Sequence, residues 1–203
     1  MNFTEAITRH ARQRPWAVAV IDRDRIVHYR TFDTAIDRAA AWLKRQGIAH
    51  GDMVGISMPG TALHLVVAYA LGRIGAVQLA LMQIDNAEAR QALAARFRIG
   101  KIIGSAPDLR AIAMLEPRPE WLDPAGRPDD APFAPEPAAE GVRINLSSGT
   151  TGRPKAVLCA GGLRSSTVIS ALARAGLTDW YNVIGGMTAW QKGGYSTVRR
   201  SAP

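Results

Sequence analysis

Two short loops hold the residue types that could do chemistry in this 203-residue chain. The first spans residues 147–155 and the second spans residues 159–164. Glycines allow backbone amides to turn toward an anion, hydroxyl groups donate further hydrogen bonds, and a lysine or arginine adds fixed positive charge. The two patterns therefore predict two anion-binding sites that are adjacent in the sequence.

The first loop follows a predicted strand over 142–146 and ends in a lysine. It differs in spacing from the G-x-x-x-x-G-K-[ST] loop of nucleoside triphosphatases, and it lacks the helix that follows that loop. A plain turn between strands is the alternative, which nine such residues in this order make unfavourable. The predicted phosphate-binding residues, with no metal ligand among them, are Ser147, Ser148, Gly149, Thr150, Thr151, Gly152 and Lys155.

This loop resembles the [ST]-[STG]-G-[ST]-[ST]-G-x-P-K signature of the adenylate-forming synthetase superfamily, which includes the AMP-binding acyl-CoA synthetases. The segments 29–32, 47–54 and 70–77 are also similar to the N-terminal region of that family, so the resemblance covers residues 1 to about 157. It implies weak binding of ATP or AMP with magnesium. The later motifs of the family have no counterpart after Lys155, so we expect no adenylate formation.

The second loop begins with the only cysteine of the chain and ends with an arginine. Backbone amides, the N-terminus of a predicted helix over 165–175 and Arg164 would all stabilise the thiolate of Cys159. The alternative is an inert, buried cysteine, which is the usual state of an isolated thiol. The glycines and the closing arginine favour the reactive interpretation.

The Cys-x4-Arg spacing resembles the active-site loop of rhodanese-like sulfurtransferases, and residues about 156–195 are similar to the C-terminal half of that domain. The resemblance implies that Cys159 takes sulfur from a donor such as thiosulfate, without a cofactor, and that Arg164 braces the loop as a second catalytic residue. It also implies a persulfide cradle formed by Ala160, Gly161, Gly162 and Leu163. The first half of the rhodanese pattern does not appear upstream.

The pattern of elements predicts an α/β fold. Apolar strands over 54–58, 77–81 and 101–104 alternate with helices over 61–74 and 86–97, which is typical of parallel βαβ units. The N-terminal part is predicted to hold a helix over 4–13, a hairpin over 17–29 and a helix capped by Thr31. Residues 107–141 are rich in proline and are expected to form an irregular excursion or linker.

We therefore predict a synthetase-like region over 1–157, a strand-loop-helix-strand rhodanese remnant over 156–195, and a tail over 196–203. The net charge of +8 comes from scattered arginines, which favours a solvated basic surface over a nucleic-acid partner. No apolar stretch is long enough to span a membrane. With one cysteine and no secretory signal, a cytoplasmic location is expected.

Three functions remain open at this stage. The first is sulfur transfer or sulfur carriage through a persulfide on Cys159, which needs one nucleophile and a ring of donors. The second is a catalytically inactive remnant of an acyl-CoA synthetase that binds ATP or AMP. The third is an inactive fusion product, because two truncated patterns in one chain conflict with each other.

Overall fold

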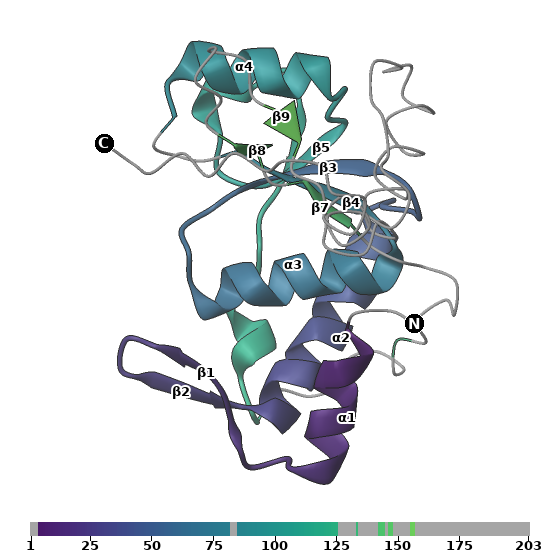
Figure 1. Ribbon diagram of the computed structural model, residues 1–203, viewed down its shortest axis with the longest axis vertical. Coiled ribbons are helices and arrows are strands. Elements are labelled where there is room, and N and C mark those ends of the chain that lie inside the picture. The colour runs from purple at the N-terminus through teal and green to yellow at the C-terminus, as the bar shows by residue number, and fades with distance from the viewer. Residues whose placement is uncertain are drawn as a thin grey trace, which may run out of the picture. The chain divides into compact units, whose positions relative to one another are not determined.

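The computed structural model describes residues 4–81, 85–125, 133, 142–144, 146–147 and 155–156. The chain divides into two compact units, Met1–Arg143 and Ile144–Pro203. In the described part of the first unit, helices cover a parallel sheet and a separate hairpin lies beside them (Figure 1). This arrangement confirms the predicted α/β class for that unit.

The main sheet has the strand order β6-β5-β3-β4-β7. Its strands are β3 (Met53–Ser57), β4 (Val77–Ala80), β5 (Lys101–Gly104), β6 (Ala113–Leu115) and β7 (Val142–Ile144). Strand β3 pairs in parallel with both β4 and β5, and β5 pairs in parallel with β6. Val54, Ile56 and Ile102 are buried on these strands, as expected for a sheet covered on both faces.

Two helices provide the crossovers between the central strands. Helix α3 (Ala62–Ile74) joins β3 to β4, and helix α4 (Ala87–Arg96) joins β4 to β5. Thr61 and Asn86, predicted as the first residues of these helices, are their N-caps, because the Thr61 side chain accepts a hydrogen bond from His64 N and the Asn86 side chain accepts one from Ala89 N. Helices α3 and α4 lie on opposite sides of the sheet (Figure 1), so its central strands are shielded from water.

Three further elements complete the N-terminal region: helix α1 (Glu5–Gln13), the antiparallel hairpin β1 (Val18–Asp22) with β2 (Arg25–His28), and helix α2 (Tyr29–Arg45). The prediction that Thr31 caps α2 is wrong, because the helix begins two residues earlier. Tyr29 N donates to Ala17 O at 3.0 Å and Arg30 N donates to Pro15 O at 3.1 Å. These bonds satisfy backbone donors at the helix start, so no side-chain cap is needed.

The proline-rich stretch is not a linker as far as residue 125. It contains the short 3₁₀ helices η1 (Pro107–Leu109) and η2 (Pro119–Leu122), with β6 between them in the sheet. Each proline lies at the first position of its helix, where the missing N–H group leaves no bond unmade. The prediction of an irregular segment is therefore wrong for this part.

Long-range contacts tie η2 to the N-terminal elements. Trp121 and Leu122 are buried in the main core, and the Trp121 ring lies 5.5 Å from the Trp42 ring of α2. Arg25 Nη2 donates to Leu122 O at 2.6 Å, and Arg38 Nη1 donates to Trp121 O at 3.3 Å. Residues far apart in the sequence thus share one core.

The described part of the second unit consists of β8 (Leu146–Ser147) and β9 (Lys155–Ala156), which pair in an antiparallel ladder. The strand predicted over 142–146 is observed as two short strands, β7 and β8, and the strand predicted to begin at residue 156 begins at 155. The elements predicted over 159–195, and the tail, lie outside the described residues.

Candidate functional site

The ends of the predicted phosphate loop are held together by the pairing of β8 with β9. Leu146 is paired with Ala156, and Ser147 is paired with Lys155. Directly opposed residues in an antiparallel ladder have Cα atoms about 4.5–5.5 Å apart. The pairing therefore brings the two ends of the predicted loop together, with Ser147 directly opposite Lys155; we call this pair the loop neck.

The other predicted site residues lie outside the part of the chain that the structure describes. In the phosphate loop these are Ser148, Gly149, Thr150, Thr151 and Gly152. In the second loop they are Cys159, Ala160, Gly161, Gly162, Leu163 and Arg164. The structure thus brings together the two ends of the first loop, and the geometry of the persulfide cradle stays a prediction.

A buried polar cluster that the sequence analysis missed lies at the carboxyl ends of β3 and β5. Ser57 Oγ donates to Ser105 O at 2.7 Å, and Arg90 Nη2 of α4 donates to Ser57 Oγ at 3.0 Å. Arg90 Nε lies 3.2 Å from Asp108 Oδ2, close enough for an ion pair but not aligned as a hydrogen bond. The cluster joins α4, β3 and the segment after β5.

Close backbone packing next to this cluster explains Gly104. Its φ is +104°, and a Cβ at this position would lie 2.1 Å from Ser57 O. Only glycine fits such an approach. Because Asp108 lies within ion-pair distance of Arg90 and Ser57 Oγ both donates and accepts a hydrogen bond, we interpret the cluster as a structural one that shapes the carboxyl ends of β3 and β5.

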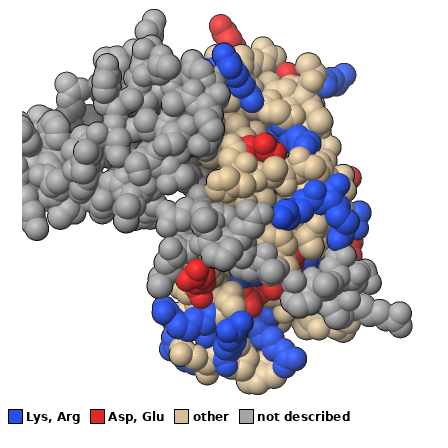
Figure 2. All heavy atoms as spheres, turned by 90° about the vertical axis from the view of Figure 1, so that its right-hand side faces the viewer, with Lys and Arg blue, Asp and Glu red and all other residues tan. Residues whose placement is uncertain are grey.

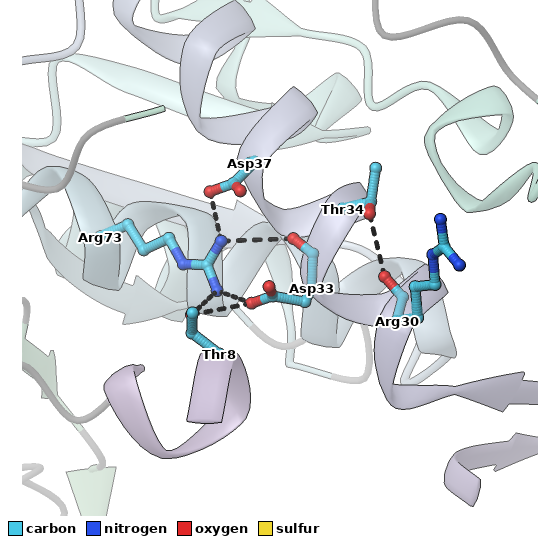
Figure 3. A network of polar contacts seen from close by, with 6 residues as sticks. All are labelled: Thr8, Arg30, Asp33, Thr34, Asp37 and Arg73. Carbon is cyan, nitrogen blue, oxygen red and sulfur yellow. Dashed lines mark hydrogen bonds and ion pairs between the residues drawn. The ribbon is translucent and has the colours of Figure 1, made fainter. Parts of the chain in front are cut away.

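A second buried ionic cluster joins three helices (Figure 3). The Arg73 side chain on α3 is 2% exposed and pairs with Asp33 and Asp37, both on α2. Arg73 Nη2 also donates to Thr8 Oγ1 of α1 at 3.0 Å, and that hydroxyl donates to Asp33 Oδ1 at 2.9 Å. Arg73 is the only Asp, Glu, Lys or Arg in α3, which is the sequence signal that could have identified it.

The two carboxylates of this cluster do not have equal surroundings. Burial raises the pKa of Asp37 above its usual value, and the neighbouring Asp33 acts in the same direction. The positive charge of Arg73 lowers that pKa and offsets part of the effect. The arrangement is that of a structural ion pair network, since one guanidinium on α3 is shared by two carboxyl groups on α2.

The described residues contain no group of three or more His, Cys, Asp or Glu side chains arranged to hold a metal ion. Over the same residues, no helix combines the length and the apolar character that crossing a bilayer requires. The site is therefore assigned from the loop neck and from comparison with known proteins.

The family model described as "AMP-binding enzyme" matches residues 7–171. This chain belongs to the AMP-binding enzyme family. The match covers every described residue from 7 onward and both ends of the predicted phosphate loop. The parallel βαβ region and the loop neck are therefore parts of one family domain.

Curated relatives in this family are synthetases and ligases. Enterobactin synthase component E of Escherichia coli strain K12 is 30% identical over 177 residues, covering 76% of this chain and 32% of that protein. Indoleacetate–CoA ligase of Aromatoleum aromaticum is 27% identical over 192 residues, covering 85% of this chain and 37% of that protein. This chain thus spans about a third of the length of these AMP-binding relatives.

Solved structures of similar fold include O-succinylbenzoate coenzyme A synthetase from Bacillus subtilis in complex with AMP. It has a TM-score of 0.63 and 20% identity, covering 82% of this chain and 45% of that one. The N-terminal subdomain of NpsA from Klebsiella oxytoca with 3-hydroxyanthranilyl-AMSN has a TM-score of 0.65 and 22% identity, covering 79% and 41%. Both agree with an N-terminal AMP-binding fold.

The family match continues past the second loop. It ends at residue 171, whereas the resemblance noted in the sequence ends at about 157, so the AMP-binding match includes Cys159–Arg164. These comparisons give no support to the predicted rhodanese-like remnant. The domain boundary near 156–157 stays a prediction.

Proposed function

We propose that residues 147–155 bind the phosphate groups of ATP or AMP and that nucleotide binding is the function of this AMP-binding domain. The observation that supports this most directly is the register of β8 with β9, which closes the loop between Ser147 and Lys155. A closed loop of glycines and hydroxyl residues can aim several backbone amides at one anion. Lys155 adds the positive charge that a phosphate needs.

The residue types of the predicted loop fit a nucleotide phosphate better than a resident metal ion. Lys155 lies at the loop neck, and a lysine acts as a point charge toward a phosphate. Magnesium would bind together with ATP, as the magnesium complex of the nucleotide. The described residues contain no cluster of carboxylates that would hold it as a separate site. Formation of an acyl-adenylate needs several converging charges, so we assign this chain binding and not the complete reaction.

Calorimetric titration with ATP and magnesium tests the proposal. A charge-assisted contact contributes about 1.5–3 kcal/mol, so Lys155→Ala should weaken binding roughly 10- to 100-fold. Lys192→Ala is the matched control, since it removes the same charge outside the loop and should bind like the parent chain. Equal affinity of the parent chain and Lys155→Ala, or no binding by the parent chain, would refute the proposal.

A second candidate function rests on the Cys-x4-Arg spacing of Cys159 and Arg164. We propose that the Cys159 thiolate attacks the outer sulfur of thiosulfate. The sulfur–sulfur bond of thiosulfate breaks, sulfite leaves with the electron pair, and a persulfide remains on the cysteine. Backbone amides of the loop and Arg164 would stabilise the terminal sulfur.

Intact mass spectrometry after incubation with thiosulfate distinguishes this candidate from the first. One added sulfur that is absent in Cys159→Ser supports sulfur transfer, and an unchanged mass of the parent chain rules it out. Arg164→Lys keeps the charge but not the planar guanidinium, so it should load less sulfur. If neither nucleotide binding nor sulfur loading is observed, the inactive fusion product is the remaining explanation.

A further inference from the structure

The β1–β2 hairpin and Trp16, which lies two residues before β1, expose apolar side chains. The exposed fraction is 69% for Trp16, 48% for Val18, 69% for Ile21 and 57% for Ile26. Ile21 and Ile26 are paired directly across the two strands, so they share one face of the ribbon. We call these four residues the hairpin patch. Among the other described residues, the large apolar side chains classed as exposed are Leu65 at 37% and Met114 at 38%.

The opposite face of the hairpin is fixed to the body of the first unit. Val27 is buried in the core and Val20 packs against it. Asp22 Oδ2 accepts a hydrogen bond from Ala62 N at 2.8 Å, and Arg25 Nη2 donates to Leu122 O at 2.6 Å. These anchors hold the hairpin with Ile21 and Ile26 on the face opposite Val27, away from the core. A sheet face turned to water normally carries polar side chains, so the isoleucine pair indicates an interaction surface.

Arginines surround the hairpin patch. The Arg30 guanidinium lies 5.6 Å from the centre of the Trp16 ring, Arg14 is exposed two residues before Trp16, and Arg23 occupies the hairpin turn. Asp24 is the opposing acid at that turn, since the Asp22 carboxylate is engaged with the start of α3. Figure 2 shows the side of the molecule that faces away from the hairpin, and there Lys and Arg side chains gather at the lower end together with Asp and Glu side chains.

We propose that the hairpin patch docks on an anionic lipid surface. The isoleucines would enter the boundary of the acyl chains, Trp16 would lie at the level of the headgroups, and the arginines would bind lipid phosphates. A stable protein interface uses about 20–30 residues on each side, many more than this patch provides. A bilayer accepts a small protruding patch because it needs no complementary shape.

Vesicle co-sedimentation of the full chain tests the proposal. Vesicles that contain phosphatidylglycerol should pull down the chain, vesicles of phosphatidylcholine alone should do so much less, and added salt should weaken the binding. The double variant Ile21→Ser with Ile26→Ser should bind roughly tenfold more weakly or not at all. Met114→Ser is the control, because it removes an exposed apolar side chain of β6 and should leave binding unchanged.

Thermal unfolding of both variants shows whether each remains folded. The replaced side chains of the double variant face away from the core, so its Tm should match that of the parent chain. Failure of the parent chain to bind phosphatidylglycerol vesicles, or equal binding by the isoleucine double variant, would overturn the proposal. So would a dimer of the parent chain in sedimentation analysis that the double variant abolishes, since that result would assign the hairpin patch to a second copy.

Discussion

Replacement of Arg73 by methionine is the sharpest test of the ionic cluster between α1, α2 and α3. Methionine keeps much of the side-chain volume but removes the positive charge that lies between Asp33 and Asp37. Two carboxylates would then face each other without the cation that they share, and the Thr8 hydroxyl would keep its bond to Asp33 but lose its contact with Arg73. The variant should therefore be strongly destabilised.

The magnitude follows from the exposure of the three side chains. Removing one partner of a buried pair costs about 3–5 kcal/mol. Arg73 is 2% exposed, but Asp33 and Asp37 are 17% and 29% exposed and can recover some hydration, so we expect the lower end, about 3 kcal/mol. With a urea m-value of about 2 kcal/mol/M, the unfolding midpoint should fall by roughly 1.5 M.

Urea unfolding followed by tryptophan fluorescence measures this loss. Arg73→Lys should lose an intermediate amount of unfolding free energy, because one ammonium group cannot donate to both carboxylates as the planar guanidinium group does. The triple variant with Asp33→Asn and Asp37→Asn removes the unpaired charges and should recover a large part of the stability. A loss below about 1 kcal/mol for Arg73→Met, or no recovery in the triple variant, would refute this account of the cluster.

Three further outcomes are expected. The folded state raises the pKa of Asp37, so this carboxyl contributes stability below its usual pKa, and that stability is lost as the pH rises through the folded pKa. Asp37→Asn does not titrate and does not lose this contribution. In urea titrations, the free energy of unfolding of Asp37→Asn relative to the parent chain should therefore increase from acidic to neutral pH. Gly104→Ala places a Cβ against Ser57 O and should lower the Tm by several degrees, and an unchanged Tm would contradict the close approach. Asn86→Ala should cost about 1 kcal/mol of unfolding free energy through the lost bond to Ala89 N, whereas Asn86→Asp should keep most of it.

The sequence predicted the parallel βαβ region well, because its signals are local. The apolar strands and the helical segments between them were recognised from a few neighbouring residues each, although Thr61 and Asn86 are caps of these helices and not their first residues. The start of α2 was misplaced, since the bonds that satisfy its first N–H groups come from the backbone at Pro15 and Ala17. Such a tertiary contact has no signature at Thr31 itself.

The proline-rich stretch shows the limit of composition as a guide. Proline content alone predicts an irregular segment, but burial of Trp121 against Trp42 stabilises an ordered path through it. Likewise, the Arg90 ion pair with Asp108 depends on the position of α4 above the sheet, which residue spacing does not specify. At the candidate site, the nine-residue signature predicts a phosphate loop, and the strand register shows that Ser147 and Lys155, the two ends of that segment, are paired.

The hydrogen bond between Arg25 and the carbonyl of Leu122 has a consequence for how the chain folds during its synthesis on the ribosome. These residues are 97 positions apart, and Arg38 makes a similar contact with Trp121 across 83 positions. At about 5–20 residues per second, the hairpin and α2 are made several seconds before the segment that completes their packing. During that interval the indole of Trp42 lacks its contact with Trp121. Nascent chains that end before η2 therefore expose an apolar surface that a chaperone can recognise.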